Sequence, residues 1–223
     1  MAISCYARIN AQENPVENYL KQVKDYACIY NGRLEMNYNS LIYDDLPYYK
    51  NSDFTDASII YRNNYYPNQK VRLDLFKEQL IILSPEKQFE IIADSQDLEK
   101  VWMYNKTFIW LTPPKESGLK TGFYMQLLDR GKMQLLCKIS FTMQSELTTY
   151  HFEQSVRYYL LYNDRYYPVK DKGSFSKLFS QYKKQINQFT KEHKLNFKSK
   201  IQDYSLVSLV LYCEELLTST NKQ

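Results

Sequence analysis

Two histidines, His151 and His193, are the side chains whose proton-transfer chemistry fits neutral pH. His151 lies in a strand-like run two residues before Glu153, so both side chains fall on one face of a strand. A nearby carboxylate can orient an imidazole as a general base, which gives a hydrolase-type hypothesis. We favour a simple cross-strand pair, because no nucleophile accompanies His151. His193 follows a predicted helix, whose dipole its charge would complement.

Acidic residues form two loose clusters, Asp44-Asp45 and Asp53 with Asp56. They could bind calcium together with backbone carbonyls, but their spacing does not match a calcium-binding loop. The sequence contains no G-x-S-x-G, H-E-x-x-H or G-x-G-x-x-G motif and no phosphate-binding glycine loop. We therefore predict no catalytic residue, no metal site and no cofactor, and regard a binding protein as more consistent with the sequence than an enzyme.

The four cysteines do not form a C-x-x-C pair, so the sequence does not indicate a zinc or thioredoxin-like site. Cys28, Cys137 and Cys213 lie in apolar surroundings, where a free thiol behaves as a small hydrophobic side chain. An exported protein could instead pair them as a disulfide. The sequence leaves the pairing open.

Tyrosine is the most unusual feature of the composition, with 22 residues. Adjacent tyrosines in a strand put one ring on each face, so one can join the core while the other meets a partner. An outward ring can stack on a sugar face or a partner protein, or it can simply cover a sheet edge. The predicted binding surface consists of Tyr61, Tyr65, Tyr66, Tyr162, Tyr166 and Tyr167.

Lysines give the chain a small excess of positive charge, +4 in total, concentrated between residues 170 and 200. Such a segment could hold phosphates of nucleic acid or of an anionic surface while Tyr182 and Phe189 stack on bases. Both rings fall on the apolar stripe of a predicted helix, however. We therefore favour a solvated helix face, and nucleic acid is not an expected partner.

Short β-branched or aromatic runs dominate residues 31–168 and predict antiparallel strands. Asp129-Arg130-Gly131 separates two of them and predicts a hairpin, because glycine adopts the left-handed backbone of a tight turn. Residues 59–67 and 160–168 share the pattern apolar, apolar, Tyr, three polar residues, Tyr, Tyr, Pro. This pattern predicts a strand, a three-residue turn and a second strand.

Helical patterns flank this β region. Asn14-Pro15 predicts the start of an N-terminal helix within residues 13–30. Ser174 is the predicted cap of the first of two C-terminal helices, which lie within residues 169–223 and pack on the sheet. The sequence thus predicts a single α+β domain over 13–223, mainly an antiparallel β sandwich or open barrel built from hairpins.

The N-terminus bears on localisation. Ile9-Asn10-Ala11 ends in a small residue typical of a signal-peptidase site, which predicts that residues 1–12 are the remnant of a signal peptide. Export to the periplasm or cell surface follows from this hypothesis. If Met1 is the true start, the protein is cytoplasmic. No run of apolar residues is long enough to span a membrane.

Several segments carry a resemblance, chiefly residues 29–33, the Ile60-Tyr61 hairpin, Gly122-Phe123-Tyr124, residues 158–168 and residues 194–198. Together they resemble an uncharacterised family of secreted proteins common in Bacteroidetes, over most of residues 13–217. That family has no established activity, so the resemblance implies only export and an envelope-associated role. We expect a non-enzymatic protein that binds an envelope protein or a glycan through exposed tyrosines.

Overall fold

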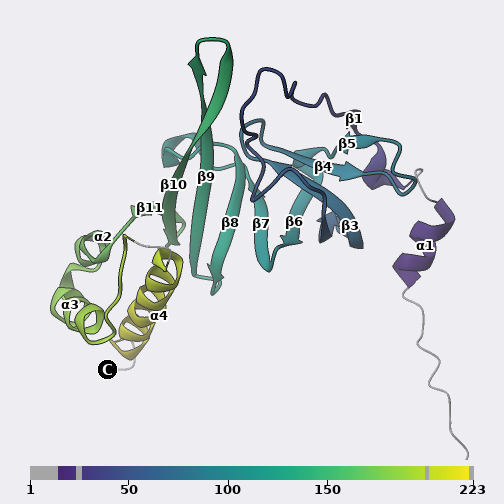
Figure 1. Cartoon of the computed structure of the whole chain (residues 1–223). Helices are drawn as coiled ribbons and strands as arrows, with labels where there is room; N and C mark the ends of the chain where they lie inside the picture. Colours follow the sequence, from purple (N-terminus) through teal and green to yellow (C-terminus); the bar gives the residue numbers. More distant parts are fainter. Residues whose placement is uncertain (1–14, 24–26, 199–200, 221–223) are drawn as a thin grey trace, which may run out of the picture.

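One antiparallel sheet makes up most of the protein. The computed structural model describes residues 15–23, 27–198 and 201–220, and eleven strands lie in the order β1-β5-β4-β3-β2-β6-β7-β8-β9-β10-β11 (Figure 1). The strands are β1 (Arg33–Leu34), β2 (Thr55–Tyr61), β3 (Asn64–Asp74), β4 (Gln79–Leu83), β5 (Glu90–Ile92), β6 (Leu98–Met103), β7 (Lys106–Leu111), β8 (Gly122–Asp129), β9 (Met133–Glu146), β10 (Thr149–Tyr162) and β11 (Arg165–Val169). The predicted α+β class is confirmed, and the strands form one open sheet and not two facing sheets.

The two similar hairpins turn on two residues each. Arg62-Asn63 joins β2 to β3 and Asn163-Asp164 joins β10 to β11, and all four residues have positive φ. This is the type I′ geometry, whose twist matches that of a hairpin. The predicted three-residue turns are thus one residue shorter, because Asn64 and Arg165 already pair within the ladder.

The sheet curls until the β3–β4 turn reaches β8 and β9. Glu78 in this turn accepts a hydrogen bond from the Phe123 amide of β8 at 2.7 Å and forms an ion pair with Lys138 of β9. Gly122 begins β8 with φ of 146°, and a Cβ there would lie 2.5 Å from the Glu78 carboxylate. Only glycine leaves space for the charged pair against the backbone.

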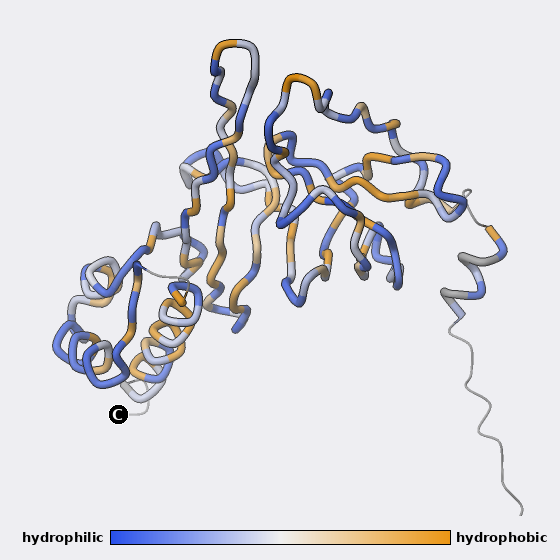
Figure 2. Tube along the Cα trace, viewed as in Figure 1, coloured by the Kyte–Doolittle hydropathy of each residue, from blue (hydrophilic) through white to orange (hydrophobic). Residues whose placement is uncertain are grey.

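The loop before β2 fills the interior of the curled sheet. The Tyr49 amide donates to the Leu73 carbonyl at 2.8 Å, and the Tyr49 ring meets Phe108 edge to face, with centroids 4.8 Å apart. Fully buried side chains such as Leu73, Leu80 and Val101 complete this core. Buried residues follow one another in β4 and in the first half of β9, where Figure 2 shows mostly apolar stretches, so both faces of these strands are covered.

Helices lie at both ends of the sheet. α1 (Pro15–Val23) contacts β3, and a 3-10 turn, η2 (Cys28–Tyr30), leads into β1. The helix predicted within 13–30 is therefore confined to its first half among the described residues. Ala27 is already extended. Gly32 lies so close to β5 that a Cβ there would collide with the Ile92 carbonyl.

The C-terminal helices cover the other end. They are α2 (Lys172–Leu178), α3 (Lys183–Glu192) and α4 (Gln202–Thr220), with a 3-10 turn, η5 (Ser180–Tyr182), between the first two. α2 packs on β11 and α4 on β8 and β9, as predicted for a helical tail. The cap of α2 is Asp171, and Ser174 completes its capping box three residues later. None of the helices within the described ranges is long and apolar enough to cross a membrane.

Candidate functional site

The predicted tyrosine surface does not form as one exposed patch. Tyr61 and Tyr66 are buried, with 2% and 3% of their surface exposed, whereas Tyr65 is 44% exposed. The Tyr66 hydroxyl lies 2.9 Å from the Cys28 sulfur, and the Tyr61 hydroxyl reaches Asp97 at 3.4 Å. The expectation that all three face a ligand is thus corrected. The curl of the sheet puts Tyr61 and Tyr66 inside.

The second tyrosine group lies far from the first in the sheet. Tyr162, Tyr166 and Tyr167 are half-buried at the β10–β11 hairpin, and Tyr162 packs edge to face on Phe179 at 5.3 Å. Four strands, β6 to β9, separate β2 from β10. Neighbouring strands are antiparallel at each of the five steps from β2 to β10, so β2 and β10 run in opposite directions. The β2–β3 turn and the β10–β11 turn therefore lie at opposite ends of the strands. The six tyrosines are not brought together.

His151 occupies the protruding part of the β9–β10 hairpin. Its side chain is 41% exposed and its Nδ1 lies 3.9 Å from a carboxylate oxygen of Glu146. Glu153 is exposed on the same strand. This geometry is a solvated surface pair.

One residue of each acidic cluster, Asp45 and Asp56, contacts a neighbouring strand. Asp45 accepts a hydrogen bond from the Phe152 amide at 3.0 Å, which fixes the loop before β2 to β10. Asp56 pairs with Lys70 at 2.9 Å across the β2–β3 hairpin. Within the part of the chain that the structure describes, no three His, Cys, Asp or Glu side chains are placed to hold a metal ion. Cys28, Cys137 and Cys213 are all free thiols.

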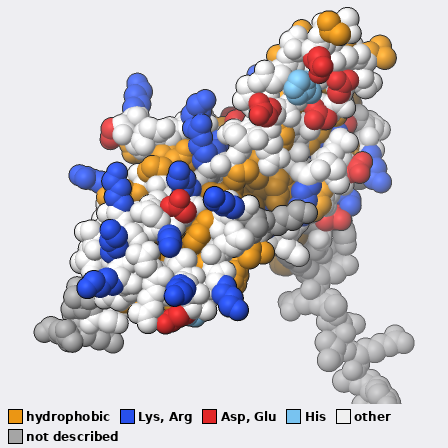
Figure 3. All heavy atoms as spheres, turned by 60° about the vertical axis from the view of Figure 1, so that its left-hand side comes forward, with side chains coloured by type: hydrophobic (Ala, Val, Ile, Leu, Met, Phe, Trp, Pro, Cys, Tyr) orange, Lys and Arg blue, Asp and Glu red, His pale blue; other side chains and the backbone are white. Residues whose placement is uncertain are grey.

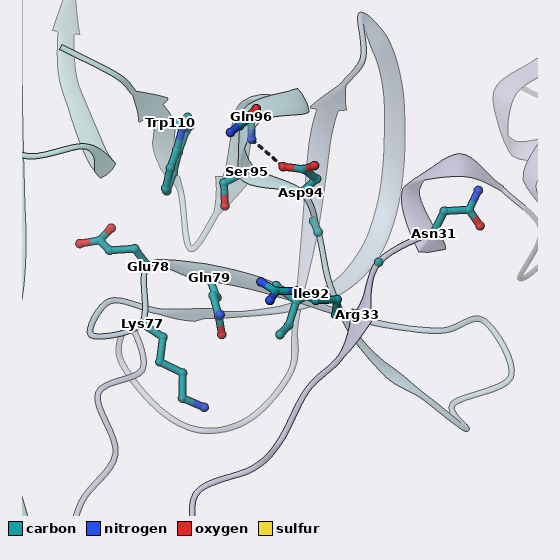
Figure 4. A pocket seen from close by; sticks show the side chains of 12 residues that line it. Asn31, Arg33, Lys77, Glu78, Gln79, Ile92, Asp94, Ser95, Gln96 and Trp110 are labelled. Atoms are coloured by element: carbon teal, nitrogen blue, oxygen red, sulfur yellow. Dashed lines mark hydrogen bonds between the residues drawn. The ribbon is translucent and has the colours of Figure 1, made fainter. Parts of the chain in front are cut away.

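A polar pocket of about 670 Å³ lies beside the Glu78 ion pair (Figure 4). Its volume is within the roughly 300–1,000 Å³ typical of small-molecule sites. Five segments converge on it: the loop before β1, the β3–β4 turn, the end of β5, the 3-10 turn η3 (Ser95–Asp97) and β7. Its main lining side chains are Asn31, Arg33, Lys77, Glu78, Gln79, Asp94, Ser95, Gln96 and Trp110.

Glu78 forms a fixed wall of this pocket. Its φ of 55° is left-handed, which is uncommon outside glycine and holds the carboxylate toward Lys138. Burial raises the pKa of the Glu78 carboxyl, while Lys138 and the Phe123 amide favour its charged form. Burial likewise lowers the pKa of Lys138. Because both carboxylate oxygens of Glu78 are already bonded, this residue serves the architecture and not proton transfer.

Gln79 presents an unpaired acceptor. Gln79 lines the pocket, and its side-chain oxygen is fully buried and has no hydrogen-bond partner among the described residues. An unsatisfied buried acceptor costs about 1–3 kcal/mol, so this oxygen destabilises the free protein.

Trp110 supplies an aromatic wall. Its ring is half-buried and held edge to face on Phe123, with centroids 5.1 Å apart. In Figure 4 the Trp110 ring and the residues of η3 line one side of the pocket, and Gln79, Lys77 and Arg33 line the other. Lys77 is engaged by Glu35 at 2.7 Å, so its charge is largely neutralised.

The remaining pocket groups are mostly amides and hydroxyls. The Asn31 and Gln96 side chains each carry an acceptor and a donor, Ser95 carries a hydroxyl, and the Asp94 carboxylate accepts a hydrogen bond from the Gln96 backbone amide at 3.1 Å. Such a lining suits a ligand whose groups both donate and accept. Sequence reasoning missed this site, because its residues come from segments without a common motif.

Comparison of the chain with protein-family models, with curated proteins and with solved structures found no match. The resemblance to secreted Bacteroidetes proteins therefore stays an expectation.

Proposed function

We propose that the protein is a non-enzymatic, exported saccharide-binding domain whose ligand occupies the pocket between Trp110 and Gln79. The pocket itself carries the proposal, since it is of ligand size and combines the Trp110 ring with convergent amide and hydroxyl side chains. Sugar hydroxyls donate and accept hydrogen bonds, as the amide side chains around them do. The apolar face of a sugar ring matches an aromatic wall.

The proposed ligand is still a glycan, but its proposed site is the pocket beside Trp110 and not the tyrosine surface. The tyrosine pairs give support only at Tyr65, whose ring lies 6.4 Å from that of Trp102 on the exposed side of β2, β3 and β6. The pocket supports binding better, because it is concave and combines an aromatic wall with convergent polar groups. Export is part of the proposal on the basis of the Ile9-Asn10-Ala11 segment, and cell fractionation tests it.

Intrinsic fluorescence provides a direct test, since the chain has two tryptophans. Replacing Trp102 with Phe leaves Trp110 as the only reporter. We expect members of a panel of neutral mono- and oligosaccharides to change its emission saturably, and calorimetry on the unmodified chain to give the same affinity. Trp110→Ala should abolish the calorimetric signal.

Tyr65→Ala with Tyr166→Ala is the matched control, because both tyrosines lie outside the pocket lining. This double variant should bind the sugar as the unmodified chain does. Loss of binding here, with retention in Trp110→Ala, would transfer the site to the tyrosines. A panel without a single binder would refute the proposed function.

A further inference from the structure

Five lysines surround a groove of about 930 Å³ at the helical end of the molecule. They come from the β11–α2 connection (Lys170, Lys172), the end of α3 (Lys191) and the segment that leads to α4 (Lys194, Lys198). All five are exposed. Figure 3 shows Lys and Arg side chains spread over this end, whereas acidic side chains gather at the opposite end beside a histidine.

Among the described residues, none of the five lysines forms an ion pair with a carboxylate. Asp171 is the one acidic residue of the groove lining, and its carboxylate accepts a hydrogen bond from the Ser174 backbone amide at 3.0 Å as the cap of α2. With five lysines and one aspartate, the groove lining carries a net positive charge.

The walls of the groove are tied together. The Gln202 side chain of α4 donates to the Lys170 carbonyl at 3.1 Å, and the Asn196 amide donates to the Ser205 hydroxyl of α4 at 3.0 Å. The Leu195 amide donates to the Thr190 carbonyl at 3.0 Å, which anchors the segment to α3. A ligand would thus meet lysines on a preformed scaffold, which reduces the entropy lost on binding.

An aromatic ring lines the groove among the lysines. Phe197 is half-buried, packs against the core and contributes to the lining together with Leu195. Phe189 and Tyr182 lie outside the groove lining. Phe189 stacks on Tyr212 with centroids 4.0 Å apart, and Tyr182 packs against the core.

We infer that this groove binds single-stranded nucleic acid, with the lysines on the phosphates and a base against Phe197. A basic groove with an aromatic platform is the arrangement that recognises single strands without sequence preference. A flat bilayer would meet the lysines at the rim but would leave the ring in the hollow without a partner. The inference is independent of the saccharide pocket.

Fluorescence anisotropy with a labelled oligodeoxythymidine tests the inference on the full chain. Contacts between five lysines and phosphates predict that the logarithm of the association constant falls with the logarithm of salt concentration at a slope of about −3.5, from about −0.7 per contact. Lys172→Gln, Lys191→Gln and Lys194→Gln together should reduce this slope to about −1.4.

A second triple variant controls for net charge. Lys177→Gln, Lys183→Gln and Lys184→Gln remove the same charge from exposed positions of the same helices outside the groove lining. This variant should keep the slope of the unmodified chain. Equal loss in both triple variants would show general attraction and overturn the inference, as would no binding at low salt.

The role of the ring is tested separately. Phe197→Leu keeps an apolar side chain in place, and circular dichroism verifies its fold. We expect it to weaken oligonucleotide binding about fivefold or more, because base stacking is lost. It should leave binding to inorganic polyphosphate unchanged, since polyphosphate has no bases. Equal effects on both probes, or binding of anionic phosphatidylglycerol vesicles in place of the oligonucleotide, would overturn the inference.

Discussion

Cationic side chains have opposite surroundings in the curled sheet and in the helical end. In the sheet, Lys138 pairs with Glu78, Lys77 with Glu35, and Arg72 with Glu90 at 2.7 Å. Arg72 is also held against the Tyr48 ring, 4.4 Å from its centroid. At the helical end, the five groove lysines are exposed and have no acidic partner among the described residues.

This difference distinguishes cations that stabilise the fold from cations that are free to attract a ligand. A buried cation with a partner is part of the packing, and removing either member leaves the other uncompensated. An exposed cation without a partner contributes little to stability but raises the local potential. Overall charge, at +4, does not distinguish the two kinds.

The largest effect should come from alkaline pH, which acts on the buried hydroxyls of the sheet. Burial raises the pKa of Tyr48 from 10.0 to about 12, and it also raises the pKa values of Tyr124 and Tyr158. The unfolded chain therefore ionises first. Stability is complete below about pH 10 and falls by up to about 1.4 kcal/mol per pH unit for each such tyrosine above it.

Urea unfolding followed by circular dichroism at increasing pH measures this loss, and tyrosinate absorbance reports ionisation. Unfolding and the appearance of buried tyrosinate should coincide. Titration of all tyrosines below the unfolding transition would contradict the assignment of these hydroxyls to the core.

Removing a structural cation should have the next largest effect. Lys138→Met leaves the Glu78 carboxylate without its partner, and we expect a loss of about 3–5 kcal/mol in the free energy of unfolding. Adding Glu78→Gln should restore most of it, since no charge then remains buried. Denaturant titration checks both variants. A cost below about 1 kcal/mol for Lys138→Met would abolish the contrast between the two regions.

A smaller effect of opposite sign is expected at the pocket. Gln79→Met keeps the volume but removes the unsatisfied oxygen, so it should stabilise the free protein by about 1 kcal/mol. Thermal unfolding of the variant beside the unmodified chain checks this prediction. Destabilisation would show that the oxygen has a partner in the folded protein.

The smallest effect should come from the groove lysines. The triple variant at Lys172, Lys191 and Lys194 should change the free energy of unfolding by less than about 0.5 kcal/mol per substitution, since these side chains are exposed. Denaturant titration beside Lys138→Met provides the comparison. A cost similar to that of Lys138→Met would mean that the groove charges are structural as well.

Local pattern was sufficient to predict most of the sheet. The run Gln79–Leu83 is a strand with those bounds, and Gly131 turns the predicted hairpin with φ of 68°. These features depend on neighbouring residues alone. The interruption of the first C-terminal helix at Phe179 was missed, because its cause is tertiary packing against Tyr162.

The candidate sites were beyond such reasoning. Alternation predicts that Tyr65 and Tyr66 face opposite sides of a strand, but it does not tell which side the curl encloses. Glu78 and Lys138 are 60 residues apart, and neither has a local signal for the other. The pocket and the groove arise where separate segments meet, so their residues share no motif.

The bond from Phe152 to Asp45 has a consequence for synthesis of the protein. Its two residues are 107 positions apart, so the early loop lacks this anchor until β10 leaves the ribosome, although its contacts with β3 form earlier. At synthesis rates of about 5–20 residues per second, this interval lasts roughly 5–20 seconds. During that time, the nascent chain exposes unpaired strand edges and aromatic side chains that a chaperone would recognise.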